Sequence, residues 1–173
     1  MAKAFAAALL LALAGCAGYG GRGLIAGQAG EADVVAVMGA PALRWIDGDG
    51  TRRLAYPRGP MGTATYMVRV GADGKLSSIE NALVTEVFAR VRAGMSQEQV
   101  LHLLGPSEPS WTVHFPARDE LAWEWRYCDD GNQYARFDVL FDATTRTVRS
   151  TLSLTESQVG NCGGPDGSCW CAH

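Results

Sequence analysis

The sequence predicts an α+β fold made of tandem small modules, each with a helix-turn-helix corner packed on an antiparallel β-sheet. Two stretches, at residues 30–39 and 80–105, carry helix start and stop signals or repeat apolar residues at helical spacing. The remaining segments alternate apolar and polar residues around Asp-Gly turns, as antiparallel strands do. Gly39 and Gly105, which end the two helical stretches, lie 66 positions apart, and this spacing suggests a duplicated unit.

The first module is expected over residues 30–79 and is the degenerate copy, because it lacks a clear first helix. "GEADVVAVMG" (30–39) has acidic residues in its first turn and a glycine as its stop, which indicates one helix. Four strands should follow, in "ALRWI", "TRRLAY", "TATYMVRV" and "KLSSI", joined in pairs by "DGDG" at 47–50 and by Asp73-Gly74. A hairpin turn explains "DGDG" without calcium, since the further acids of an EF-hand loop are missing.

The second module is expected over residues 80–155. "IENALVTEVFARVRAG" predicts a helix that ends at Gly94, and Ser96 with Gln99 forms a capping box that begins a second helix, which ends at Gly105-Pro106. Four strands should follow, in "SWTVHF", "AWEWRYC", "QYARFDVLF" and "TVRSTLSL". Because units of this size are individually marginal, we expect the two modules to share an interface.

Residues 1–15 have the features of a bacterial lipoprotein signal peptide. Lys3 precedes an apolar run that is too short to span a bilayer, and "LAGC" ends at Cys16, where a lipobox would place the lipidated cysteine. Acyl chains on Cys16 would anchor the chain in the membrane, at roughly 0.8 kcal/mol for each buried methylene. Ala17 is not an acidic inner-membrane retention signal, so we expect the outer membrane, facing the periplasm. Residues 16–29 should form a flexible tether.

The corner of the second module resembles the BamE (SmpA/OmlA) family of small outer-membrane lipoproteins. The matching pattern is Gly94, Met95, Ser96, Val100, Leu104 and Gly105, and the strand aromatics Trp125, Tyr127, Phe137 and Phe141 match more loosely. The resemblance implies helices packed on an antiparallel sheet and an accessory role in β-barrel assembly. The tandem arrangement is similar instead to the β-lactamase-inhibitor-like fold. None of the family's contact residues can be transferred to a position here.

Residues 156–173 are rich in glycine and cysteine and predict a mobile tail. An exported protein favours disulfides, and Cys128, Cys162, Cys169 and Cys171 are the candidates, with three pairings open. A bond from Cys128 would attach the tail to the second module. Soft-metal binding by the tail cysteines and His173 is the alternative, but their spacing matches no standard zinc site. We therefore expect no metal.

Composition and motifs give no sign of catalysis or nucleic-acid binding. The formal charge of −3 offers no basic surface for nucleic acid. His102 and His114 have no neighbouring nucleophile or acid in a catalytic pattern, and Asp129-Asp130 is better explained as a turn. We expect a protein that is not an enzyme and has no cofactor.

These features together predict a lipid-anchored scaffold or accessory binding protein. Its partner would be an envelope protein, and by the resemblance this could be the β-barrel assembly machinery. The alternative is a lipid-tethered, inhibitor-like module that binds an envelope enzyme.

Overall fold

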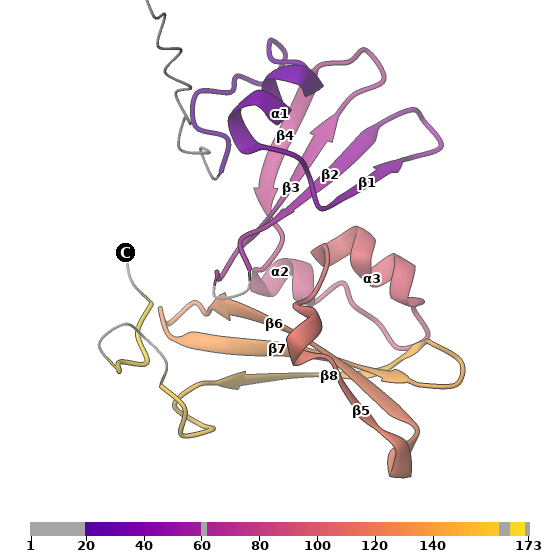
Figure 1. The fold of residues 1–173 in the computed structure, drawn as a ribbon, viewed down its shortest axis with the longest axis vertical. Helices are drawn as coiled ribbons and strands as arrows, with labels where there is room; N and C mark the ends of the chain where they lie inside the picture. The colour runs from indigo at the N-terminus through magenta and orange to yellow at the C-terminus, as the bar shows by residue number, and fades with distance from the viewer. Residues whose placement is uncertain (1–19, 60–61, 163–166, 172–173) are drawn as a thin grey trace, which may run out of the picture.

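Two four-stranded antiparallel sheets form the main body of the chain in a computed structural model that describes residues 20–59, 62–162 and 167–171 (Figure 1). In each sheet the strands are neighbours in sequence order. The first sheet contains β1 (Leu43–Ile46), β2 (Arg52–Pro57), β3 (Thr65–Val70) and β4 (Leu76–Asn81). The second contains β5 (Val113–Phe115), β6 (Glu120–Cys128), β7 (Tyr134–Asp142) and β8 (Val148–Thr155). All eight strands lie within three residues of the predicted segments.

The predicted fold class is wrong, because the chain is mostly β. Strands make up 39% and helices 18% of the chain, and helix-turn-helix corners do not recur in tandem on the two sheets. The α-helices of the described residues are α1 (Glu31–Met38), α2 (Thr85–Phe88) and α3 (Gln97–Leu104), with short 3₁₀ turns η1 (Pro109–Trp111) and η2 (Pro116–Arg118). The duplicated spacing therefore reflects strands and their turns more than helices.

The long helix predicted from residue 80 is reduced to the single turn α2. Glu80 and Asn81 instead continue β4, opposite Met67 and Tyr66 of β3. The side-chain oxygen of Asn81 then accepts the backbone N–H groups of Thr65 and Leu83, at 3.2 and 3.1 Å, which ends the strand. Sheet pairing has overridden the helical spacing of the apolar residues. The module boundary predicted between residues 79 and 80 consequently falls inside β4.

The first sheet is covered on both faces. On one face α1 buries Val34 and Met38 against the sheet. The buried residues of the sheet in this cluster are Leu54, Tyr56, Val68, Val70 and Leu76. On the other face a smaller cluster contains Ala55, Met67 and Ala82, with Leu43 and Trp45 packed against it. This second face is turned toward α2 and α3, which lie between the two sheets (Figure 1).

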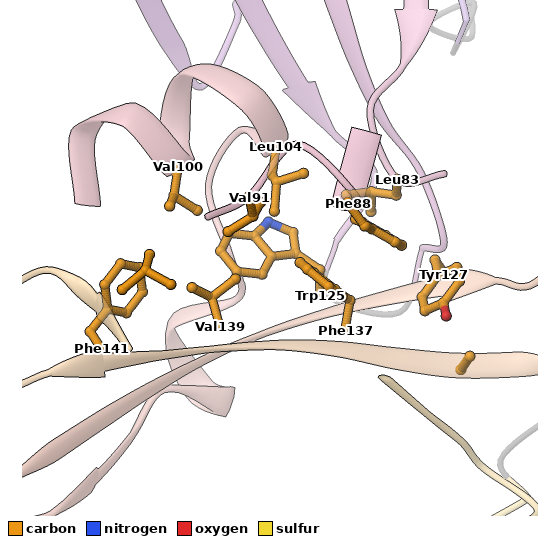
Figure 2. Close-up of a cluster of buried hydrophobic side chains, with 12 residues drawn as sticks. Leu83, Phe88, Val91, Val100, Leu104, Trp125, Tyr127, Phe137, Val139 and Phe141 are labelled. Carbon is orange, nitrogen blue, oxygen red and sulfur yellow. The ribbon is translucent and has the colours of Figure 1, made fainter. Parts of the chain in front are cut away.

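The second sheet has one face covered by α2 and α3. Figure 2 shows Val100 and Leu104 of α3 above Trp125 and Val139, and Phe88 of α2 above the same strands. The Phe88 ring stacks on Phe137 at 4.1 Å between centroids. Ser96 caps α3 as predicted: its hydroxyl accepts the Gln99 backbone N–H at 3.2 Å, and the Gln99 side chain accepts the Ser96 N–H at 2.8 Å.

The segment expected to be a free tether is attached to the first sheet over its described part, from Gly20 onward. The Gly27 N–H donates to the Leu76 carbonyl at 2.8 Å, and the Leu76 N–H donates to the Ala29 carbonyl at the same distance. Leu24 and Ala29 pack against the cluster below α1. Apolar burial and these backbone bonds overcome the flexibility that the glycines suggested.

The described part of the C-terminal tail is also held in place, against the prediction of mobility. The Tyr134 N–H donates to the Cys169 carbonyl at 2.8 Å, and the Cys171 N–H donates to the Asn132 carbonyl at 2.9 Å. Disulfides join Cys128 to Cys171 and Cys162 to Cys169. The first of these attaches the tail to the end of β6.

We expect Gly105→Ala to destabilise the fold more than Gly39→Ala. Both glycines end a helix at nearly the same backbone angles, φ 71° and ψ −173° for Gly105 and φ 85° and ψ −168° for Gly39, so alanine is similarly strained at both. A Cβ at Gly105 would lie 2.7 Å from Cγ2 of the buried Thr65, whereas one at Gly39 meets no atom within 4 Å. Urea unfolding should show an excess loss of at least about 1 kcal/mol for Gly105→Ala. Equal losses would show that α3 does not press on the first sheet here.

Removing the Cys128–Cys171 disulfide should cost more stability than removing Cys162–Cys169. The bonded cysteines are 43 and 7 residues apart, and a longer loop restricts the unfolded chain more. Paired Cys→Ser replacements should lower the free energy of unfolding by about 4 and about 2 kcal/mol, respectively, in urea titrations. The opposite ranking would contradict this pairing.

Candidate interaction surface

The residues of the sequence motif form a structural corner between α2 and β8. Val100 and Leu104 are fully buried in the second core, and Met95 packs against it. The Gly94 N–H donates to the Val148 carbonyl, and the Val148 N–H donates to the Met95 carbonyl, both at 2.8 Å. These residues connect helix and sheet. Cys16, the expected lipid attachment site, lies outside the described residues.

The cysteine candidates are brought together as two disulfides, and their thiols are therefore not free to bind a metal. His173, the fourth ligand of the alternative, lies outside the described residues. Within the described ranges, no three His, Cys, Asp or Glu side chains are grouped so as to hold a metal ion.

The face of the second sheet that points away from α2 and α3 has no described α-helix on it, although the 3₁₀ turn η1 places Trp111 over Arg126 at its edge (Figure 1). We call this surface the open face. Strand register arranges it in rows of neighbouring residues: Val113, Ala122, Leu140 and Ser150 in one row, then Glu124, Asp138 and Leu152, then Arg126, Arg136 and Leu154. Large apolar side chains are exposed on it, with Val113 and Leu152 each 44% exposed and Phe115 38%.

Carboxylates on and beside the open face are paired with arginines. Arg136 forms two bonds to the buried Glu156, at 2.7 and 3.0 Å, and also reaches Glu124 at 3.3 Å. Arg126 Nε lies 3.5 Å from Glu124 Oε1 without a hydrogen bond, and the Arg126 guanidinium stacks over the Trp111 ring at 4.1 Å. Further ion pairs are Arg118–Glu120 at 2.8 Å and Arg149–Asp142 at 2.6 Å, and Arg149 also lies 3.9 Å from Asp119.

Asp138 is the exception on this face. It lies directly opposite Glu124 on β6 and Leu152 on β8, and no hydrogen bond or ion pair joins its carboxylate to a described residue. The pKa of Asp138 is raised to about 6, chiefly by burial and then by the negative charge of Glu124, and the positive charge of Arg136 offsets only part of this rise. The free protein therefore holds a partly desolvated carboxylate that forms no hydrogen bond or ion pair within the described chain, although the charge of Arg136 on the same strand face partly offsets that of Glu124.

The two sheets also meet around α3. The Trp45 indole N–H donates to Glu98 at 2.7 Å, and the Trp45 ring lies 4.6 Å from the His102 ring. A cavity of about 260 Å³ lies nearby, between the loop after β2, η1 and β6; its lining includes Pro57, Pro106, Pro109, Trp111 and Trp125. The Trp125 indole nitrogen is buried without a hydrogen-bond partner in the described chain. The contacts of Trp45 join the first sheet to α3, and His102 is part of this packing.

The sequence pattern did not single out Asp138, because this residue is one of the polar residues that alternate with apolar ones along the predicted strand. A partial signal was present: Glu124-x-Arg126 and Arg136-x-Asp138 each place opposite charges on one face. Antiparallel register was needed to show that the two acids face each other and that Arg136 is already bound to Glu156. Trp111 stacks on Arg126, and Trp125 is buried in the core.

We expect Asp138→Asn to stabilise the protein at alkaline pH and to have little effect in acid. Because the pKa of Asp138 is higher in the folded chain, the unfolded chain loses this proton first, and stability falls as pH rises from about 4 to about 6. The asparagine variant lacks this loss. Urea unfolding should find it more stable by about 1 kcal/mol at about pH 8, after allowance for solvent screening, and equal at about pH 4. A less stable variant at alkaline pH would mean that the carboxylate has a partner within the fold.

No family model, no curated protein and no solved structure matches the chain. No helix in the described ranges is both long and apolar enough to cross a bilayer. The resemblance to the BamE family therefore remains a prediction.

Proposed function

We propose that this protein is a lipid-anchored binding protein of the bacterial envelope that contacts a protein partner through its open face. The supporting observation is the contrast between this face and the covered faces. Both faces of the first sheet and the inner face of the second are packed against helices, whereas Val113, Phe115 and Leu152 remain exposed on the fourth. Clustered exposed apolar residues surrounded by charged ones are typical of interaction sites.

The position of Gly20 is compatible with an open face that is directed away from the membrane. The first described residue, Gly20, lies beside the ring of Tyr66 in the first sheet, on the other side of α2 and α3 from the open face (Figure 1). Cys16 is four residues earlier, so the lipid attachment point would be within about 14 Å of Gly20. The first sheet would then lie nearer the membrane, with the open face directed toward the periplasm.

The partner suggested by the motif resemblance is a subunit of the β-barrel assembly machinery at the outer membrane. Capture of a soluble envelope hydrolase would instead favour an inhibitor-like role. Both are binding functions, and both would use an exposed protein surface instead of a catalytic group.

Affinity purification from mild-detergent membrane extracts tests the proposal. We expect a partner to co-purify in a stoichiometric amount with the tagged wild-type protein. Val113→Glu with Leu152→Glu should lower its recovery at least about tenfold, because charge is placed in the apolar part of the contact. Ile46→Glu is the matched control, since Ile46 is 76% exposed but lies on the first sheet.

Cys16→Ala tests the anchor separately. We expect this variant to leave the membrane fraction and to lose labelling by palmitate. Equal recovery of the partner by the open-face variant and the wild type would contradict the proposed binding surface. Membrane retention and palmitate labelling of Cys16→Ala would contradict the proposed anchor.

A further inference from the structure

We infer that the partner places a lysine or arginine side chain against Asp138, at the centre of the open face. This inference rests on the proposed function, because it specifies the chemistry of the group that the same surface receives. The argument uses the charge balance of the face, the apolar residues around Asp138 and the exclusion of other occupants.

The charge balance of the face leaves one position for a cation. Glu120, Glu124, Asp142 and Glu156 each lie within 3.5 Å of an arginine nitrogen, and Asp138 has no such partner in the described chain. Glu124, directly opposite, adds a second negative charge to its surroundings. A cation placed between the two strands here would be attracted by both carboxylates and would relieve their repulsion.

The neighbours of Asp138 favour a cation on a long aliphatic stem. Leu152 lies directly beside Asp138 on β8, and Leu140 follows two residues later on the same face of β7. Lysine and arginine can pack their methylene groups on such apolar side chains while the charged end reaches a carboxylate. A small hydrated ion would leave Leu152 exposed, whereas a protein side chain would cover it.

Other occupants fit less well. An acidic partner would find Arg136 already bound to Glu156 and Glu124, and the Arg126 guanidinium covered by the Trp111 ring. A second copy of this chain, stacked face to face, would bring its own Asp138 and Glu124 toward the same acidic row. A neutral apolar surface would bury Asp138 without a partner, at a cost that a cation avoids.

Site-specific photocrosslinking of the full-length lipidated protein in native membranes tests this inference. The photoreactive residue p-benzoylphenylalanine is placed at Val113 or at Ser150, on opposite sides of Asp138, and at Ile46 as a control outside the face. Cross-linked partner peptides are identified by mass spectrometry. We expect peptides from positions 113 and 150 to contain a lysine or arginine at or next to the contact.

Three variants of residues 138 and 86 then measure the role of charge. Asp138→Asn should reduce the cross-link yield roughly tenfold, while Asp138→Glu should restore most of it because the charge is retained. Glu86→Gln is the matched control, since it removes one exposed carboxylate from α2, on the other side of the sheet. Thermal melts verify that all three are folded.

Each outcome separates this inference from the proposed function. Cross-links at 113 and 150 that contain no basic residue, or that persist in Asp138→Asn, would overturn the inference and leave the open face as a binding surface. No cross-link at either position would overturn both. A loss in Asp138→Asn with rescue by Asp138→Glu, and a basic residue in the peptide, supports it.

Discussion

Residues 85–104 contain α2 and α3 and must pack against both sheets at once. The rest of the packing depends on this constraint. Val100, Leu104 and Phe88 fill the core of the second sheet. The end of α3 approaches the first sheet so closely that Gly105 leaves no space for a Cβ beside Thr65. Since the segment is committed to both inner faces, it cannot also cover the outer face of the second sheet. That face is left open as a consequence.

The open face combines paired charges with exposed apolar side chains. Arginines neutralise most of its carboxylates, and Arg126 also covers the Trp111 ring. These pairs lower the cost of bringing charges together on a partly desolvated surface. Asp138 forms no such pair with an arginine, and its position opposite Glu124 is unfavourable for the isolated fold. Uncompensated charges of this kind are more easily explained by an interaction than by stability.

The structure agrees with the sequence prediction where an element is determined by residues close together in the chain. The eight strands and the capped helix α3 were predicted because alternation and capping boxes act over a few residues. The helix predicted over residues 80–94 failed because β3 offered Glu80 and Asn81 a long-range pairing that local spacing cannot show. The attachment of residues 20–30 was missed for the same reason, since it depends on partners more than 30 positions away. The link from Cys128 to the tail was foreseen as one of the open pairings, but its partner Cys171 was not fixed by the sequence.

The sequence was sufficient to establish which side chains share a face, where the turns fall and which cysteines were available for pairing. These properties follow from backbone periodicity and from the chemistry of single residues. The folded chain was needed to establish which face is covered, that Cys128 pairs with Cys171, and that Asp138 faces Glu124 and not an arginine. Burial and charge pairing depend on segments far apart in the chain, whose relative placement is set by sheet register and by the shared packing of α2 and α3.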